Sequence, residues 1–257
     1  MLWRVVSGAA SAQVQLTRQN VEDLRPILTM PLLTLISISV LVHSGRVELA
    51  HYGLVAAMLM TMGQMGNFVA SEIVFQERNG QTLELVVASP SPYVFVLAAR
   101  IVVLTLGGLV GVAESWLIAR LVFGLHLSIH HPLLLAGTLL AASLAAAGTA
   151  LLTAALFSLG RQVRTFQNAI NGPLYLLGGV LVPVAYLPDW LRPLSPFVFF
   201  TWAANLLRAA FASTEPEAVG FSLCAILALG AAAAALGGLL LRRMLDNLRR
   251  RGTLGLS

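Results

Sequence analysis

Six long apolar segments constrain the fold of this chain more than any other feature of its sequence. Each is long enough to cross a hydrocarbon core of about 30 Å as a helix. Helices are required because lipid cannot satisfy open backbone groups. The predicted spans cover residues 27–43, 52–71, 94–118, 133–157, 168–188 and 219–241. We therefore predict an all-α membrane protein with six transmembrane helices.

Composition supports lipid as the main solvent of the chain. Hydrophobic residues make up 58% of the sequence and charged residues 11%, whereas a soluble domain is about a quarter charged. We predict one membrane domain over residues 1–257. Its first segment mixes polar and apolar residues without a continuous apolar run, which predicts an interfacial amphipathic helix rather than a signal peptide. The predicted parts are this helix at 1–25, the bundle at 26–241 and a basic cytoplasmic tail at 242–257.

Arginine positions predict which ends of the spans face the cytoplasm. All 16 basic residues are arginine, because the sequence contains no lysine. With the N-terminus in the cytoplasm, twelve arginines lie inside, and four lie outside, namely Arg46, Arg120, Arg192 and Arg208. Cytoplasmic loops normally carry the excess of basic residues. We therefore predict a multi-pass protein with both termini in the cytoplasm.

The absence of lysine also excludes some chemistry. A nucleotide-binding P-loop needs its lysine on the phosphates, and a Schiff base needs one as well. Cys224 is the single cysteine of the sequence, so it has no partner for an intrachain disulfide. His126 and His130 have helical spacing but lack the glutamate of a zinc-protease motif. We predict no catalytic, cofactor or metal site in this chain.

Two connections between the spans have unusual sequences. The connection after the second span is acidic, carries an apolar stripe and ends at Pro90 and Pro92. We predict a short helix there, along the cytoplasmic surface. The connection at 187–211 is rich in aromatic residues and prolines, and prolines interrupt a helix. We predict a broken extracytoplasmic hairpin of short re-entrant or interfacial helices after the fifth span.

Both connections contain motifs that resemble those of a known family. The first motif is Glu77-Arg78-Asn79-Gly80-Gln81-Thr82-Leu83-Glu84, followed by Ala88-Ser89-Pro90. The second runs from Gly178 to Pro183 and continues through Leu187-Pro188-Asp189-Trp190-Leu191 to Leu194-Ser195-Pro196. With the order of the spans, they resemble the ABC-2 type permease family over nearly the whole chain. In one departure, Gln81 precedes the threonine where the family usually has glycine, and Gly80 lies one position earlier.

The resemblance implies the partners of the chain. Two permeases, identical or paralogous, would pair in the membrane, and each would dock a separate ABC ATPase subunit. Docking would use a short coupling helix around Gln81–Ser89, and ATP and magnesium would be bound by the ATPase. The residues assigned to this coupling are Glu77, Arg78, Gly80, Thr82, Leu83, Glu84 and Pro90. A solvated surface is the alternative for the charged members of this set.

Polar residues follow one helical face on each of two predicted spans. On the second span, Gln64, Asn67 and Ser71 share a face with Met60, beside a stripe formed by Met58, Met62 and Met65. Asn168, Asn171 and Tyr175 share a face on the fifth. Amides in a membrane face protein or a water-filled path. Each face is therefore either a wall of the substrate pathway or a helix contact in the dimer. Glu114 either has a function within the third span or reaches the outer interface.

The predicted function is the permease subunit of an ATP-driven exporter in the bacterial cytoplasmic (inner) membrane, surrounded by lipid and without a nucleic-acid partner. A small amphipathic or hydrophobic substrate (a drug, an antibiotic or a lipid) suits the apolar, Met-rich spans. A polysaccharide or glycolipid exporter is the alternative, and more aromatic residues along the pathway would be expected of it. An ATP-independent carrier or an intramembrane enzyme would need charged or catalytic groups at membrane depth.

Overall fold

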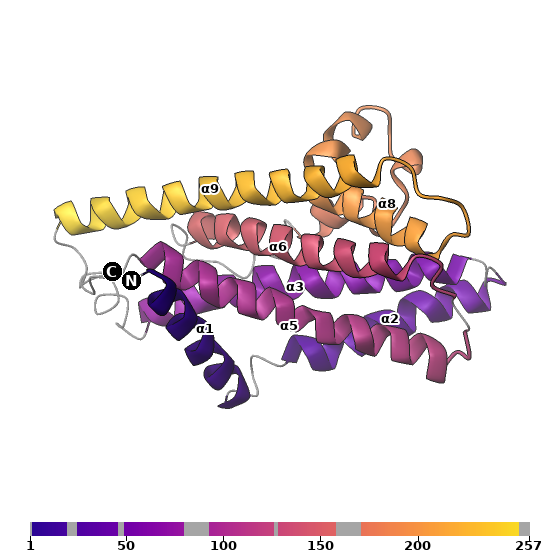
Figure 1. The fold of residues 1–257 in the computed structure, drawn as a ribbon, viewed down its shortest axis with the longest axis horizontal. Coiled ribbons are helices and arrows are strands. Elements are labelled where there is room, and N and C mark those ends of the chain that lie inside the picture. Colours follow the sequence, from indigo (N-terminus) through magenta and orange to yellow (C-terminus); the bar gives the residue numbers. More distant parts are fainter. Residues whose placement is uncertain are drawn as a thin grey trace.

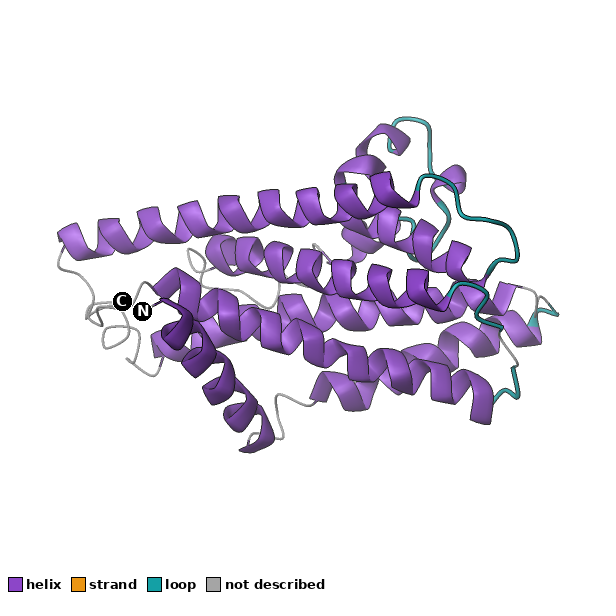
Figure 2. Cartoon of the chain, in the orientation of Figure 1, coloured by secondary structure: helices purple, strands orange, loops and turns teal. Residues whose placement is uncertain are grey.

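The computed structural model describes residues 2–19, 25–45, 49–79, 93–125, 128–157 and 171–251. Every regular element in these residues is a helix (Figure 2). The long helices are α1 (Leu2–Gln19), α2 (Arg25–His43), α3 (Ala50–Asn79), α5 (Tyr93–Leu121), α6 (Pro132–Phe157) and α9 (Val219–Arg251). Shorter elements are the helical residues 171–177, α8 (Phe199–Phe211), η3 (Val184–Tyr186) and η4 (Arg192–Phe197). The predicted all-helical fold is confirmed for the described residues.

The long helices run lengthwise in one bundle, as Figure 1 shows. Helix α1 crosses the bundle obliquely near the end where α9 finishes. The short elements η3, η4 and α8 gather at the opposite end. The first helix and the end of the last therefore lie at the same end of the molecule, as an even number of spans requires. That this end faces the cytoplasm stays a prediction.

Three helices of the described residues are long and apolar enough to cross a membrane, namely Tyr93–Leu121, Pro132–Leu156 and Val219–Asn247. The apolar stretch Thr34–His43 of α2 is shorter. On that stretch and just before it, Leu32, Ile36 and Val40 are 58–63% exposed at steps of four residues. Such an apolar stripe suits contact with lipid or with a second copy of the chain. The six-span topology stays a prediction.

The predicted end of the fifth span is wrong. We predicted a helix to residue 188, but the helix at 171–177 ends in a turn at Gly178 and Gly179. The N–H of Gly179 donates to the Leu176 carbonyl (3.1 Å), and that of Val180 donates to the Tyr175 carbonyl (3.0 Å). Gly179 has a φ of 65°. This pair of bonds around a left-handed glycine is a Schellman motif, which terminates a helix even where the sequence remains apolar.

Close backbone contact joins α6 to α9. A Cβ added at Gly230 would lie 2.5 Å from the Ala145 Cα, and one added at Gly237 would lie 2.6 Å from the Leu152 N. These glycines are seven residues apart and share a helix face. Small residues let helices approach closely in a membrane. Small residues at this contact therefore let the backbones of α6 and α9 pack closely.

Helix α1 is attached to the bundle through a polar contact. Gln13 is 2% exposed, and its Oε1 accepts a 2.7 Å hydrogen bond from the Nε of Arg100 on α5. Val14 and Leu16 are each 41% exposed. Of the segment 1–25 where we expected a helix, α1 forms Leu2–Gln19, and its place at a membrane interface stays a prediction. Helix α9 continues to Arg251, beyond the residue 241 where the predicted span ends.

Candidate transport site

The two predicted polar faces meet where α3 passes the helix at 171–177. The Tyr175 hydroxyl donates to the Met60 carbonyl over 3.3 Å. Tyr175 is 3% exposed, Asn171 is 8% exposed, and Gln64 is half-buried. The structure therefore brings Met60 and Tyr175 together. The two faces are therefore in contact at this level of the bundle.

A glycine on α3 allows this contact. A Cβ added at Gly63 would lie 2.6 Å from the Tyr175 Oη and 2.8 Å from the Cζ of Phe200 on α8. The Tyr175 and Phe200 rings meet edge to face with centroids 5.2 Å apart. Phe199 lies against Phe200 with centroids 4.1 Å apart. The junction of α3, residues 171–177 and α8 is thus an aromatic cluster around a glycine. We call it the outer junction, because the predicted topology places this end of the bundle outside the cytoplasm.

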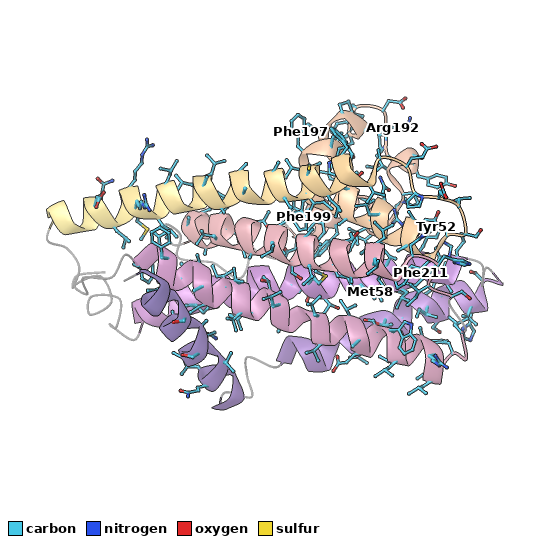
Figure 3. All side chains as sticks on the ribbon, viewed as in Figure 1. Tyr52, Met58, Arg192, Phe197, Phe199 and Phe211 are labelled. Carbon is cyan, nitrogen blue, oxygen red and sulfur yellow. The ribbon has the colours of Figure 1, made fainter. Side chains whose placement is uncertain are left out.

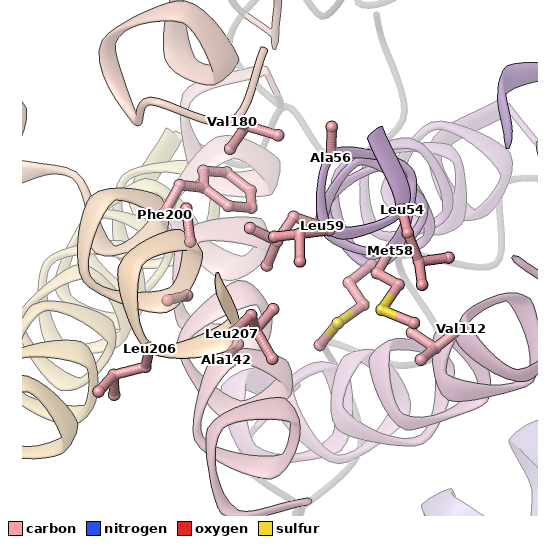
Figure 4. Close-up of a cluster of buried hydrophobic side chains, with 14 of the residues drawn as sticks. Leu54, Ala56, Met58, Leu59, Val112, Ala142, Val180, Phe200, Leu206 and Leu207 are labelled. Atoms are coloured by element: carbon pink, nitrogen blue, oxygen red, sulfur yellow. The ribbon is translucent and has the colours of Figure 1, made fainter. Parts of the chain in front are cut away.

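The methionine stripe lies inside the chain. Met58, Met62 and Met65 are each 1% exposed. A Cβ added at Gly108 of α5 would lie 3.5 Å from Met65 Cβ and 3.5 Å from Met62 Cα. Figure 4 shows Met58 between Leu54 and Val112 in the hydrophobic core. In this conformation the stripe packs α3 against α5.

Arg208 ties α8 to two other elements of the outer junction. Its Nη2 donates to the Gly179 carbonyl over 2.6 Å, beside the left-handed turn that ends the preceding helix. Its Cζ lies 4.8 Å from the ring centroid of Tyr52, near the start of α3. Figure 3 shows Tyr52 at the end of the bundle where α8 lies. A guanidinium over an aromatic face is attracted by the ring. Arg208 thus links α8, the turn at Gly179 and α3.

The carboxyl end of α8 is capped by the connection between α5 and α6. The backbone N–H groups of His130 and His131 both reach the Ala210 carbonyl at 3.1 Å. The His130 Nδ1 lies 2.9 Å from the Phe211 carbonyl, a contact that requires the hydrogen on Nδ1. The last carbonyls of a helix need such partners. These histidines, expected in an external loop, therefore position α8.

Several predicted site residues cannot be placed in contact with others. Asn67 lies on α3, where only the backbone is described, and Asn168 lies outside the described residues. Of the residues assigned to ATPase coupling, Glu77 and Arg78 belong to the last turn of α3, and their side chains are not described. Gly80, Thr82, Leu83, Glu84 and Pro90 lie outside the described residues. These assignments stay predictions.

Glu114 is half-buried on α5. Its Oε2 is buried and has no hydrogen-bond partner among the described residues. The neighbouring Ser115 hydroxyl lies 2.9 Å from that of Thr34, which joins α2 to α5. Arg120 stacks on Trp116 with its Cζ 5.3 Å from the ring centroid. The two alternatives for Glu114 stay open.

Comparison with known proteins decides the family of this chain. A model of the ABC-2 type transporter family matches residues 9–212. The chain belongs to this family. The matched region runs from the middle of α1 past the end of α8, so this ABC-2 permease carries the family pattern through the whole outer junction. No curated protein matches the sequence. The family supplies the membrane component of ABC transporters, which normally works with an ABC ATPase subunit.

Gly63, Phe200 and Arg208 belong to the outer junction and were missed by sequence reasoning. Arg208 carried a signal, because it is the single charge in the otherwise apolar segment Phe199–Phe211. A lone charge in an apolar helix usually has a specific partner. Gly63 and Phe200 carried no such signal, since glycine and phenylalanine are ordinary in an apolar helix.

Replacing Gly63 with valine is expected to destabilise the outer junction. The new side chain would occupy space held by Tyr175 and Phe200, and overpacking of this kind costs about 1–3 kcal/mol. The matched control is Gly107→Val on α5, where an added Cβ meets nothing within 4 Å. Thermal unfolding in detergent measures both variants. Equal midpoints for the two would contradict the packing at Gly63.

Proposed function

We propose that this ABC-2 permease is the membrane-spanning subunit of an ATP-driven exporter. It moves a small amphipathic or hydrophobic substrate, such as a drug, an antibiotic or a lipid, out of the cytoplasm or the inner leaflet. The observation that carries the proposal is the family match over residues 9–212. The absence of lysine supports a separate motor, because a P-loop needs that residue. ATP and magnesium are then bound and used by the partner ATPase.

The course of α3 supports a mechanical link between motor and pathway. The helix runs without a break from Ala50 to Asn79, so it is about 45 Å long. Its first turns contact the outer junction through Tyr52 and Met60. Its last turn carries Glu77 and Arg78, which begin the predicted coupling motif. A displacement at the ATPase would be transmitted along this helix to α8 and to the turn at Gly179.

Burial at the outer junction favours the small apolar substrate over a polysaccharide. Tyr175, Phe199 and Phe200 are each 3% exposed and pack against one another. Their faces are therefore used within the chain and do not form a row along a path for sugar rings. The polysaccharide or glycolipid exporter stays the second candidate, since the same rings would become available if α8 moved away from α3.

A pair of permeases fits the apolar surfaces of the bundle. The stripe at Leu32, Ile36 and Val40 on α2 and the exposed Leu236 and Leu239 on α9 suit lipid or a second permease. We propose that two copies, or this chain and a paralogue, form the complete transporter. The protein would lie in a bacterial cytoplasmic membrane with both termini inside, as the arginine distribution predicts.

Purification from the native membrane tests the proposal. An ABC ATPase is expected to co-purify with the wild type in mild detergent, to hydrolyse ATP, and to be lost from the variant Glu84→Arg. The matched control is Glu215→Arg, an equal charge reversal in the connection between α8 and α9, at the other end of the bundle. Tandem mass spectrometry identifies the partner and phosphate release measures its activity.

Three outcomes oppose parts of the proposal. If the wild type retains no ATPase, the carrier and enzyme alternatives replace the ATP-driven exporter. If Glu84→Arg retains as much ATPase as Glu215→Arg, the coupling element lies elsewhere. If the purified complex in vesicles exports oligosaccharide-lipid but no small lipophilic dye, the second candidate replaces the first.

A further inference from the structure

An apolar groove of about 340 Å³ lies between α5 and α9, with α6 as its floor. Ala98 and Val102 line it from α5, Gly148 and Leu151 from α6, and Leu227 and Ala234 from α9. Its walls reach the surface of the bundle, since Leu144 and Leu227 are 49% and 44% exposed. The outer junction contributes none of these residues.

The groove exists because small residues line much of it. Alanine and glycine predominate among its lining residues. Gly230 lies against Ala145 so closely that no side chain separates α9 from α6 at this point. Toward the end of α9, a Cβ added at Gly238 would lie 3.5 Å from the Val94 Cγ1 of α5, so the two helices come close there. The result is an apolar hollow between α5, α6 and α9.

A cation lies beyond the groove, further along α9. The Arg242 Cζ lies 5.7 Å from the ring centroid of Phe95, so this guanidinium bridges α9 and α5 over an aromatic face. Arg242 and Arg243 are both exposed, and Phe95 is 39% exposed. A guanidinium over an aromatic ring still presents its N–H groups at the edge of its own plane, where they can donate hydrogen bonds to a phosphate.

We propose that the groove and Arg242 form a binding site for an anionic phospholipid of the leaflet next to the basic end of α9. The phosphate accepts hydrogen bonds from Arg242, and one acyl chain runs past Val94 and Gly238 and lies in the groove. The site goes beyond the proposed transport function. It depends on the family assignment only for the position of the chain in a membrane.

The distances along α9 fit such a lipid. Ala234 and Leu227 are eight and fifteen residues from Arg242, so the groove extends from about 12 to about 22 Å beyond the arginine. The headgroup layer of a bilayer is about 5–8 Å deep, and one leaflet of the core is about 15 Å thick. An acyl chain whose phosphate is at Arg242 therefore reaches the groove and ends within it. The apolar lining suits the chain, and the exposed arginine suits the anionic headgroup.

Native mass spectrometry of the purified protein tests the site with two lipids that share the same acyl chains. The probes are phosphatidylglycerol, which is anionic, and phosphatidylcholine, which is zwitterionic. The wild type is expected to bind phosphatidylglycerol more tightly. The variant Arg242→Gln is expected to lose about fivefold in affinity for it, the effect of one arginine on an anionic membrane lipid, and to keep its affinity for phosphatidylcholine.

The groove is tested separately from the arginine. Ala231 lines the groove and is exposed, so Ala231→Phe fills the hollow from outside, and it is expected to weaken binding of both lipids. Ala232→Phe is the matched control, because Ala232 is exposed and does not line the groove. Arg120→Gln is the control for the cation, because Arg120 also stacks on a ring and lies at the other end of α5. Unchanged thermal unfolding shows that each variant is folded.

Three results would overturn the site. Equal binding of the two lipids by the wild type would remove the role of the headgroup. An equal loss of affinity for phosphatidylglycerol in Arg120→Gln and Arg242→Gln would show that binding depends on the net charge of the protein and not on Arg242. If Ala231→Phe left lipid binding unchanged but dissociated dimers, a second copy of the chain would be the occupant. Because none of these measurements uses the ATPase, they can fail independently of the transport proposal.

Discussion

Replacing Gly148 with leucine is expected to prevent assembly of α6 with α9. A Cβ at this position would overlap the carbonyl oxygen of Gly230, which belongs to the backbone of α9 and cannot turn aside. Overpacking usually costs about 1–3 kcal/mol because flexible side chains adjust. Here two helix backbones would have to separate along a contact that also includes Gly237. We therefore expect a loss near or above the 4–5 kcal/mol that is exceptional for one substitution.

Gly137→Leu is the matched control for this variant. It lies on the same helix, and an added Cβ there meets nothing within 4 Å. Size-exclusion chromatography in detergent and thermal unfolding compare the two proteins. The control is expected to elute and unfold like the wild type, while Gly148→Leu aggregates or unfolds at a much lower temperature. Similar behaviour of both variants would show that α6 and α9 do not touch at these glycines.

Replacing Arg208 with methionine is expected to have the second largest effect. Methionine keeps much of the side-chain length but removes the guanidinium that donates to Gly179 and stacks on Tyr52. A hydrogen bond from a charged group contributes about 1.5–3 kcal/mol, and the stacking adds about 0.5–2 kcal/mol. The loss would release α8 from α3 and from the turn at Gly179. We therefore expect both a lower unfolding temperature and loss of transport.

Arg192→Met is the matched control for Arg208→Met. Arg192 also donates to backbone carbonyls, those of Leu187 at 2.9 Å and Ala185 at 2.8 Å, and pairs with Asp189 at 2.9 Å. These bonds stay within residues 185–192 and join only the short elements η3 and η4, not the long helices, and an exposed ion pair contributes little. Thermal unfolding and ATP-dependent dye transport in vesicles measure both variants. An effect of Arg192→Met as large as that of Arg208→Met would contradict the special position of Arg208.

The candidate site could be predicted only in part from the sequence. Helical spacing placed Met60 and Tyr175 on polar faces, and the structure joins them by a hydrogen bond. Helical spacing did not reveal that α8 would complete the site with Phe200 and Arg208. A periodicity of 3.6 residues says which side chains share a face. It does not say which other helix covers that face, because this depends on contacts between residues far apart in the chain.

The elements that could be predicted from the sequence are those whose cause is local. Long apolar runs require helices in lipid, so the helical segments were correct for α2, α3, α5, α6 and α9. As expected, no continuous α-helix forms where prolines lie between 188 and 196, just before α8. The family pattern over residues 9–212 is likewise present in the sequence itself.

How these helices meet depends on contacts between residues far apart in the sequence. The left-handed conformation of Gly179 ended a helix inside an apolar segment, and the Gly179 carbonyl accepts a bond from Arg208, 29 residues later. The contact of Gly230 with Ala145 brings α9 onto α6, and the groove between α5 and α9 lies at that contact. Hydrophobicity drives residues out of water without direction. Close packing and hydrogen bonds have direction, so the residues that contact one another are fixed only when the helices assemble.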